Sequence, residues 1–324
     1  MLALDYGDRP HELGEELSSL NRRRDTLRED KELTLILMLP AEEMSTVAEV
    51  APDLWSIRSM VAVLSAPEDI EGELHLLAQW EQRCRDAFES RLNETPHARA
   101  RYRHGVVTFA YRITSLPSPP TLRALLEVMT NTEGWTGWPP WWVPTSTTAP
   151  RVVAPGILEC WMYSDEQMFS DPVHSDYWRA STDGSFYLLR GYDEDSAPDR
   201  VEPGRVLSRS LPIWRAGEAL HHAATMAERL TSAHARVVFS TRWEGLHGRT
   251  ITSWPEAGPS APSRGAFELG SIRSSVVTNA TEIEESLPDV VARLLRPLDD
   301  AALQERPRAF IEHHLGRMRS RAVG

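Results

Sequence analysis

The sequence predicts an α/β fragment, a parallel αβαβ unit, followed by a larger α+β domain. The fragment is predicted over residues 1–65, where helical and continuously apolar segments alternate. The larger domain is predicted over residues 105–324, where short strand-like segments gather around a few helices instead of alternating with them. A run with helical spacing fills residues 66–104, and we interpret it as a helical connector between the two domains.

The N-terminal fragment is predicted from a leucine stripe and an apolar run. The stripe repeats at i, i+4, i+7 and i+14, which predicts a helix with one apolar face. The run LTLILML over residues 33–39 is apolar throughout, as expected of a strand covered on both faces in a parallel sheet. A short helix over residues 40–50 and a strand over residues 54–64 complete the expected order. The stripe consists of Leu13, Leu17, Leu20 and Leu27.

Three stretches of this fragment also occur, in the same order, in a known family. They are LNRRRD at residues 20–25, LILMLP at residues 35–40 and APDLWSIRS at residues 51–59. Together they resemble the closing part of the NTPase-like core in bacterial STAND-type signalling ATPases. The nucleotide-binding loop that precedes these segments in the family is missing here. The resemblance therefore implies a truncated NTPase fold in a signalling protein, without nucleotide hydrolysis by the usual route.

The lysine content also argues against nucleotide hydrolysis by the usual route. The chain contains 34 Arg and a single Lys, and this Lys31 follows Asp30 in an acidic stretch. A GxxxxGK[ST] phosphate loop is therefore absent from this sequence. Catalysis through a Lys Schiff base or a Ser-Lys pair is not expected either.

Charge and cysteine content narrow the class of partner and the compartment. The net charge is −12, and −10 of it lies within residues 1–100. Because proteins that bind duplex nucleic acid display a basic face, the acidic segment favours a protein partner or self-association over nucleic acid. Cys84 and Cys160 lack CxxC spacing, and the chain has neither a signal peptide nor an apolar run of about 18 residues. We therefore expect a cytoplasmic protein that does not enter a membrane.

Periodic segments predict the elements of the connector and the second domain. Pro and Gly clusters separate these segments. The predicted helices span residues 68–92, 121–129, 214–230, 287–295 and 307–319. The predicted strands span residues 106–114, 157–163, 185–190, 235–243, 249–253 and 265–278.

Five short sequence segments of the second domain occur, in the same order, in a second group of proteins. The segments are GWTGWPPWWVPT, ILECW, SDYWRA, LLRGYDEDS and LPIWRAGEAL. As a set they resemble an uncharacterised Trp-rich module of actinobacterial proteins that is often joined to Schlafen/AlbA-like domains. That module has no established catalytic residues, and the Schlafen-like part is not visible in this chain. The resemblance therefore transfers no site residue and no DNA-binding role.

Four tryptophans in a loop rich in Pro and Gly form the first candidate binding site. Exposed indoles of this kind stack on a base, a peptide aromatic or an arginine. Alternatively, the indoles wedge the loop onto a sheet and belong to the core. The residues are Trp135, Trp138, Trp141 and Trp142.

Arginines next to tryptophans form the second candidate site. Such neighbours suggest cation–π contacts, and a cluster of arginines is suited to phosphate or carboxylate. Alternatively, neighbours in a strand point to opposite faces, and only the tryptophan enters the core. The residues are Trp178, Arg179, Arg190, Trp214, Arg215, Arg242 and Trp243.

A helical ExxH motif is the basis of an enzymatic alternative. Glu218 shares a helix face with His221 or His222, and an arginine such as Arg215 would complete a hydrolytic or nucleotide-processing site. The nucleophile motif GxSxG, the zinc motif HExxH and the dinucleotide motif GxGxxG are absent.

Two acidic loops contain oxygen ligands of the kind that Mg²⁺ prefers. They lie at residues 171–176, which include His174, and at residues 193–195. Carboxylates at strand ends usually form solvated turns, so we expect neither a metal nor a cofactor.

These observations favour a non-catalytic sensor, adaptor or scaffold in a bacterial signalling or anti-phage conflict system, acting through a protein partner. The basis is the two resemblances, the missing phosphate loop and the Trp-rich loop. Two alternatives stay open: the enzyme based on Glu218, and binding of a nucleotide or single-stranded nucleic acid by the Trp-rich loop.

Overall fold

The chain is a mixture of helices and strands in two compact units, residues 1–68 and 69–324. Among the described helices, none combines the length and the apolar character that crossing a membrane requires. The computed structural model describes residues 2–5, 13–23, 25, 35–38, 44–53, 69–114, 116, 118–135, 140–163, 171–232, 234–253 and 265–321.

The first unit contains two short parallel strands and two helices. Strand β1 (Leu2–Asp5) pairs with β2 (Leu35–Met38), and helix α1 (Leu13–Arg22) contacts α3 (Met44–Val50). Strand β1 was not predicted, and the strand expected at residues 54–64 lies outside the described residues. The predicted αβαβ order is therefore not confirmed.

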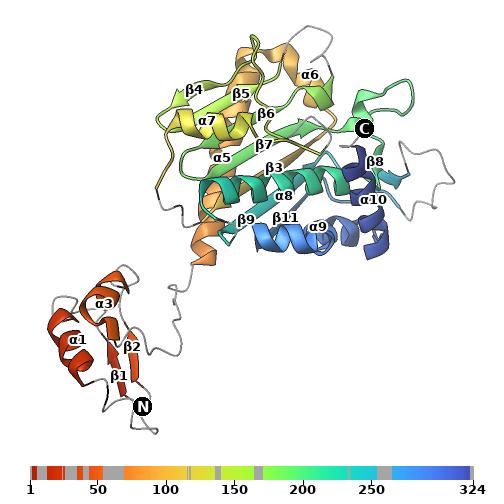
Figure 1. The fold of residues 1–324 in the computed structure, drawn as a ribbon. Helices are drawn as coiled ribbons and strands as arrows, with labels where there is room; N and C mark the ends of the chain where they lie inside the picture. Colours follow the sequence, from red (N-terminus) through yellow and green to blue (C-terminus); the bar gives the residue numbers. More distant parts are fainter. Residues whose placement is uncertain are drawn as a thin grey trace. The chain divides into compact units, whose positions relative to one another are not determined.

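A seven-stranded sheet forms the centre of the second unit (Figure 1). Its order is β11-β9-β3-β7-β6-β5-β4, and neighbouring strands are antiparallel throughout. A separate parallel pair is formed by β8 and β10. The expected mixture of helices and strands is thus confirmed, and the structure shows that the sheet is antiparallel. The strands are β3 (Val106–Ile113), β4 (Arg151–Ala154), β5 (Ile157–Trp161), β6 (Tyr177–Ser181), β7 (Ser185–Gly191), β8 (Val206–Ser208), β9 (Arg236–Glu244), β10 (Thr250–Thr252) and β11 (Ser271–Asn279).

Helices cover both faces of this sheet (Figure 1). Helix α5 packs on one face, and α7, α8, α9 and α10 contribute to the core on the other face. The helices are α5 (Ile70–Glu94), α6 (Arg99–Tyr102), α7 (Leu122–Thr130), α8 (Leu211–Leu230), α9 (Ala280–Ala301) and α10 (Arg308–Arg321), with short 3-10 helices η3 (Pro96–Ala98), η5 (Pro172–His174) and η6 (Asp193–Ser196).

The central strand β3 shows how one segment belongs to two cores. Val107, Phe109 and Tyr111 lie in the core under α8 and α9, whereas Val106 and Ala110 lie in the smaller core under α5. Successive side chains of a strand point to opposite faces, so a strand covered on both sides requires a nearly continuous apolar sequence.

Helix α5 is a layer of the second unit, and not only the connector that we expected over residues 66–104. It contacts β3, β7 and β9, and it belongs to the compact unit of residues 69–324. Its N-terminus is capped by Asp69, whose carboxylate accepts from the Gly72 N–H at 2.8 Å. The predicted apolar stripe is the face that it buries, and it consists of Leu77, Trp80, Cys84 and Phe88, continued by Leu92.

Gly217 allows α8 and α10 to approach each other closely. A Cβ atom at this position would lie 2.6 Å from Leu315 Cδ2 and 3.2 Å from Met318 Cε. Both distances are shorter than in ordinary packing, so an added Cβ requires the buried ends of the Leu315 and Met318 side chains to shift.

We therefore expect Gly217→Ala to lower the free energy of unfolding by about 1–2 kcal/mol in urea titrations, because overpacking outweighs the better helix propensity of Ala. Gly316→Ala in α10 is the matched control, since its added Cβ meets nothing within 4 Å. This control should raise stability by up to about 1 kcal/mol. Equal gains from both substitutions would contradict the close contact.

Candidate functional site

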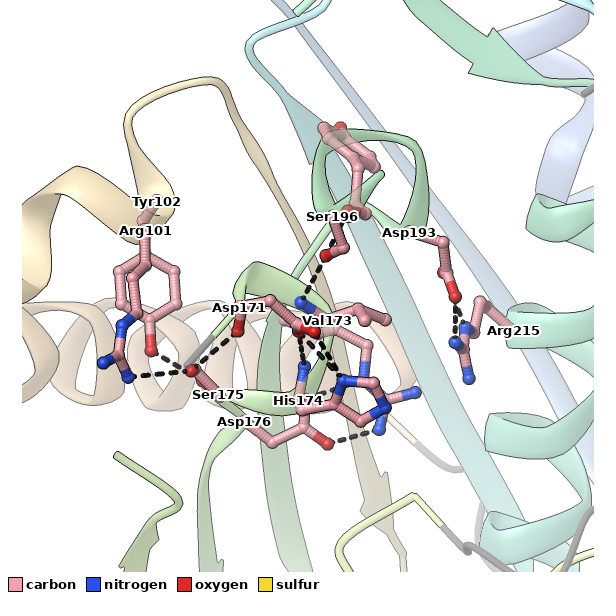
Figure 2. A network of polar contacts seen from close by, with 12 residues as sticks. Arg101, Tyr102, Asp171, Val173, His174, Ser175, Asp176, Asp193, Ser196 and Arg215 are labelled. Atoms are coloured by element: carbon pink, nitrogen blue, oxygen red, sulfur yellow. Dashed lines mark hydrogen bonds and ion pairs between the residues drawn. The ribbon is translucent and has the colours of Figure 1, made fainter. Parts of the chain in front are cut away.

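The end of β7 and the start of α8 gather several of the charged residues singled out in the sequence. Here the structure brings together Arg190, Arg215 and Glu218, with carboxylates from β6 and η6 as their partners. Figure 2 shows part of this network. We call it the β7-end cluster, and it consists of Asp176, Arg190, Asp193, Glu194, Arg215 and Glu218.

Arg190 and Asp176 form a buried two-pronged ion pair. Arg190 Nε donates to Asp176 Oδ1 at 2.7 Å, and its Nη2 donates to the other carboxylate oxygen. The two residues are 3% and 1% exposed. A pair this deep is stable only because each charge has its counterion, and removing one partner leaves a buried charge uncompensated.

Arg215 links α8 to η6. It donates to both oxygens of Asp193, at 2.6 and 3.2 Å, and lies 3.7 Å from the carboxylate of Glu218 one helical turn away. Burial acts to lower the pKa of Arg215, but the Asp193 and Glu218 carboxylates outweigh it, so the net pKa is raised. The guanidinium is therefore a fixed cation held between two carboxylates.

Glu194 is a buried acid inside the same cluster. Its Oε1 accepts from the Ser208 N–H, and its side chain is only 2% exposed. The net pKa of Glu194 is raised to about 7. Burial is the main cause and the Asp193 charge adds to it, while the Ser208 N–H opposes the shift. This carboxyl therefore titrates near neutral pH.

Arg249 fixes the next carboxylate of the run and was missed in the sequence. Its five N–H groups are all used, on the carbonyl oxygens of Gly245, Val206 and His104 and on both oxygens of Asp195. Arg249 is 0% exposed. A sequence motif could not predict that Arg249 binds Asp195, because the partners of Arg249 come from distant parts of the chain.

The cavity beside the β7-end cluster is very small. Arg190, Arg215 and Trp243 contribute to its lining, and its volume is about 10 Å³. That volume holds about one water molecule. The Trp243 Nε1 is buried and has no hydrogen-bond partner among the described residues.

A second polar group, next to the cluster, surrounds His174 (Figure 2). Its Nδ1 lies 2.9 Å from both Asp171 oxygens, and Ser175 accepts from Arg101 and, through its carbonyl, from Tyr102. The hydrogen bond to Asp171 raises the pKa of His174 against the opposing effect of burial. Among the described residues, no group of three His, Cys, Asp or Glu is placed to hold a metal ion.

The Trp-rich loop contributes to the core, as in the alternative interpretation of its sequence. Trp141 is 1% exposed and stacks on His222 at 4.6 Å, with the two rings inclined by 20°. Trp178 is 0% exposed and donates to the carbonyl of the half-buried Trp142 at 2.8 Å. Trp138 lies outside the described residues. Trp141 is therefore not part of an exposed platform.

Trp141 is also the one bulky aromatic residue with a left-handed backbone in the described part of the chain. Its φ is +56°, a conformation that costs a residue with a Cβ on the order of 1 kcal/mol or more. Its contacts with His222, Tyr111 and Phe186 hold the ring in place. Aromatic packing thus stabilises a backbone turn that the local sequence disfavours.

Arg179 and its neighbour Trp178 point to opposite faces of the sheet. Arg179 donates to Glu159 at 2.6 and 2.9 Å on the α5 side, and Arg91 of α5 donates to the same carboxylate at 2.7 and 2.8 Å. Glu159 is 1% exposed. This arrangement corresponds to the second interpretation of the Arg–Trp neighbours, and it attaches α5 to the sheet.

The enzymatic alternative keeps its Glu218–Arg215 contact, but its two histidines lie in other surroundings. His222 lies in the core, where Tyr111 Oη is 2.9 Å from its Nδ1, and burial lowers its pKa to about 3. Burial also raises the pKa of Tyr111, so the contact is a hydrogen bond between a neutral phenol and a neutral imidazole. Glu218 instead lies beside Arg215, and His221 points to another site.

That other site is a cleft between α8, α9 and α10, which we call the α8–α10 cleft. It has a volume of about 220 Å³. Trp135 stacks on His221 with 4.4 Å between ring centres, and the Arg319 guanidinium lies 4.8 Å from the Trp135 ring centre. The lining residues are Trp135, His221, Ile283, Glu284, Leu287 and Arg319.

No protein-family model, curated protein or solved structure matches this chain. The geometry of its own residues is therefore the basis for any statement of function.

We expect Asp176→Asn and Arg190→Gln each to lower the free energy of unfolding by about 3–5 kcal/mol, because each leaves a buried charge without its counterion. The double substitution should cost at least about 1 kcal/mol less than the sum, as measured by a double-mutant cycle in urea. Arg205→Gln is the control, since the Arg205–Glu202 pair is 65% and 69% exposed and should contribute less than about 1 kcal/mol. Additive costs would contradict a coupled pair.

Glu194 predicts a dependence of stability on pH. Its pKa is about 7 in the folded chain and 4.5 ordinarily, so the folded chain binds the proton more tightly than the unfolded chain. This stabilisation is present at low pH and is lost as the pH rises through about 7. Glu194→Gln keeps an acceptor for Ser208 but does not ionise.

We therefore expect Glu194→Gln to gain stability relative to the original chain, by up to about 3 kcal/mol, between about pH 5 and pH 8. Thermal unfolding across this range measures the difference. Glu202→Gln is the exposed control, because its carboxylate is 69% exposed. A difference that does not change with pH would contradict the raised pKa.

Proposed function

We propose that this chain is a non-catalytic sensor, adaptor or scaffold of a bacterial signalling or anti-phage conflict system, and that it works by binding a protein partner. One observation supports the non-catalytic part above all. In the β7-end cluster, each of the candidate groups Arg190, Arg215 and Glu218 lies against an oppositely charged side chain of the same chain.

Catalytic groups act on a substrate that reaches them, and small-molecule sites usually enclose about 300–1,000 Å³. The space beside Arg190 and Arg215 is about 10 Å³. Arg190 is enclosed with its counterion, and Arg215, although its side chain is 22% exposed, is paired with Asp193, so neither charge is left over for a substrate. This supports a function in binding over one in turnover.

The acidic N-terminal part of the chain supports a protein partner. Residues 1–100 have a net charge of −10, which repels phosphates and attracts a basic protein surface. The nucleic-acid alternative has less support, because Trp141 of the Trp-rich loop is 1% exposed and its face is not available for stacking.

The proposal is tested on the purified full chain by measuring ATP turnover and partner binding in one preparation. We expect no ATP hydrolysis above background, and a complex that re-forms from the chain and its purified host partner. Because the acidic segment attracts the partner, affinity should fall as salt is raised from about 0.05 to 0.5 M.

ATP hydrolysis that is abolished by Arg215→Gln or Glu218→Gln would overturn the non-catalytic part of the proposal. Arg205→Gln is the control for these substitutions, because its side chain is exposed and lies outside the β7-end cluster. A reconstituted complex whose affinity does not respond to salt would contradict the role of the acidic segment.

A further inference from the structure

The α8–α10 cleft differs from the β7-end cluster in how its charges are placed. Arg319 and Glu284 both line the cleft, and within the described residues neither forms an ion pair. The contact that the structure gives Arg319 is with the ring of Trp135, at 4.8 Å. A cation and an anion that share one cleft without neutralising each other are available to a ligand.

The floor and one wall of this cleft are apolar or aromatic. Ile283 and Leu287 of α9 line the cleft, but they are 2% and 1% exposed, so only a small part of each apolar side chain faces it. Trp135 and His221 form the stacked wall. Burial lowers the pKa of His221, and Arg319 lowers it further, so the imidazole is neutral at physiological pH.

Helix α9 is interrupted where it lines the cleft. Ser286 has non-helical angles, with φ −135° and ψ 31°, and Pro288 follows inside the helix. A proline has no N–H, so it cannot donate to the Glu284 carbonyl as the residue at this position does in a regular helix. The interruption therefore places a backbone acceptor on the same turn as the Glu284 carboxylate.

We propose that the α8–α10 cleft binds a free α-amino acid with an aliphatic side chain. The ligand carboxylate pairs with Arg319, its ammonium group pairs with Glu284, and its side chain lies on Ile283 and Leu287 beside the indole of Trp135. This inference goes beyond the proposed function, because the cleft needs no protein partner to bind such a ligand.

The size of the cleft fits this class of ligand. Its volume of about 220 Å³ lies below the range of about 300–1,000 Å³ that is typical of small-molecule sites, which suits a ligand as small as an amino acid. Two opposite charges on one small molecule also match the two charged residues better than a simple carboxylic acid or amine does. Each charge-assisted hydrogen bond discriminates by roughly tenfold or more.

The test is calorimetric titration of the full chain with L-leucine, leucine amide and isocaproate. Leucine amide lacks the carboxylate, and isocaproate lacks the ammonium group. We expect saturable binding of leucine and at least about tenfold weaker binding of both analogues. No saturable heat with leucine up to about 10 mM, or equal binding of all three compounds, would overturn the proposal.

Two substitutions test which residue binds the ligand carboxylate and which binds its ammonium group. Arg319→Gln should weaken leucine binding at least about tenfold and leave the weak binding of leucine amide unchanged. Glu284→Gln should weaken leucine binding to a similar degree and leave isocaproate unchanged. Arg296→Gln and Glu285→Gln are the matched controls, because these exposed residues of α9 do not line the cleft.

Circular dichroism of all four variants separates loss of binding from loss of fold, and exposed substitutions of this kind should leave the spectrum unchanged. If folded Arg319→Gln and Glu284→Gln proteins bind leucine as tightly as the original chain, the assignment is wrong. Failure of leucine to bind would leave the protein-partner proposal standing, since the two measurements are independent.

Discussion

The burial of complete arginine–carboxylate pairs at the end of β7 is the constraint on which the second unit depends. The acidic run at residues 193–195 provides three consecutive carboxyl groups, and each one is held by a different element: Arg215 of α8, the Ser208 N–H of β8, and Arg249. Removing charges from water costs several kcal/mol for each ion, and only a complete set of partners offsets that cost. Arg249, with all five N–H groups used, shows how complete such a set is here.

The second unit therefore contains two kinds of region: a rigid part in which buried charges are paired, and the α8–α10 cleft, in which the described charged residues are not. In the rigid part, Glu159 binds both Arg91 of α5 and Arg179 of β6, and so attaches α5 to one face of the sheet. The Tyr111–His222 contact joins α8 to the other face. In the α8–α10 cleft, by contrast, Arg319 and Glu284 have no ion-pair partner among the described residues, and apolar side chains lie beneath them. Binding specificity is therefore expected where charges are left unpaired over an apolar floor, and rigidity where they are paired.

Elements with strong periodicity were predictable, and elements made by distant pairing were not. The buried stripe of α5 follows from spacing alone, because helical geometry places such residues on one face. Strand β6 (Tyr177–Ser181) was missed, since Arg179 interrupts its apolar pattern and the compensating Glu159 lies on β5. Among the candidate residues, the pairing of Arg190 with Asp176 was likewise invisible, because two separate strands supply the partners.

The sequence by itself determined that no phosphate loop is present, that most of the negative charge lies in residues 1–100, and that residues 105–324 combine strands with a few helices. Those properties depend on composition and local spacing. The tertiary structure decided that Trp141 belongs to the core, that Glu194 and Asp195 after β7 are buried instead of solvated, and that Trp135 lines a cleft. Burial and ion pairing depend on which distant segments the fold places side by side, and neither composition nor spacing contains that information.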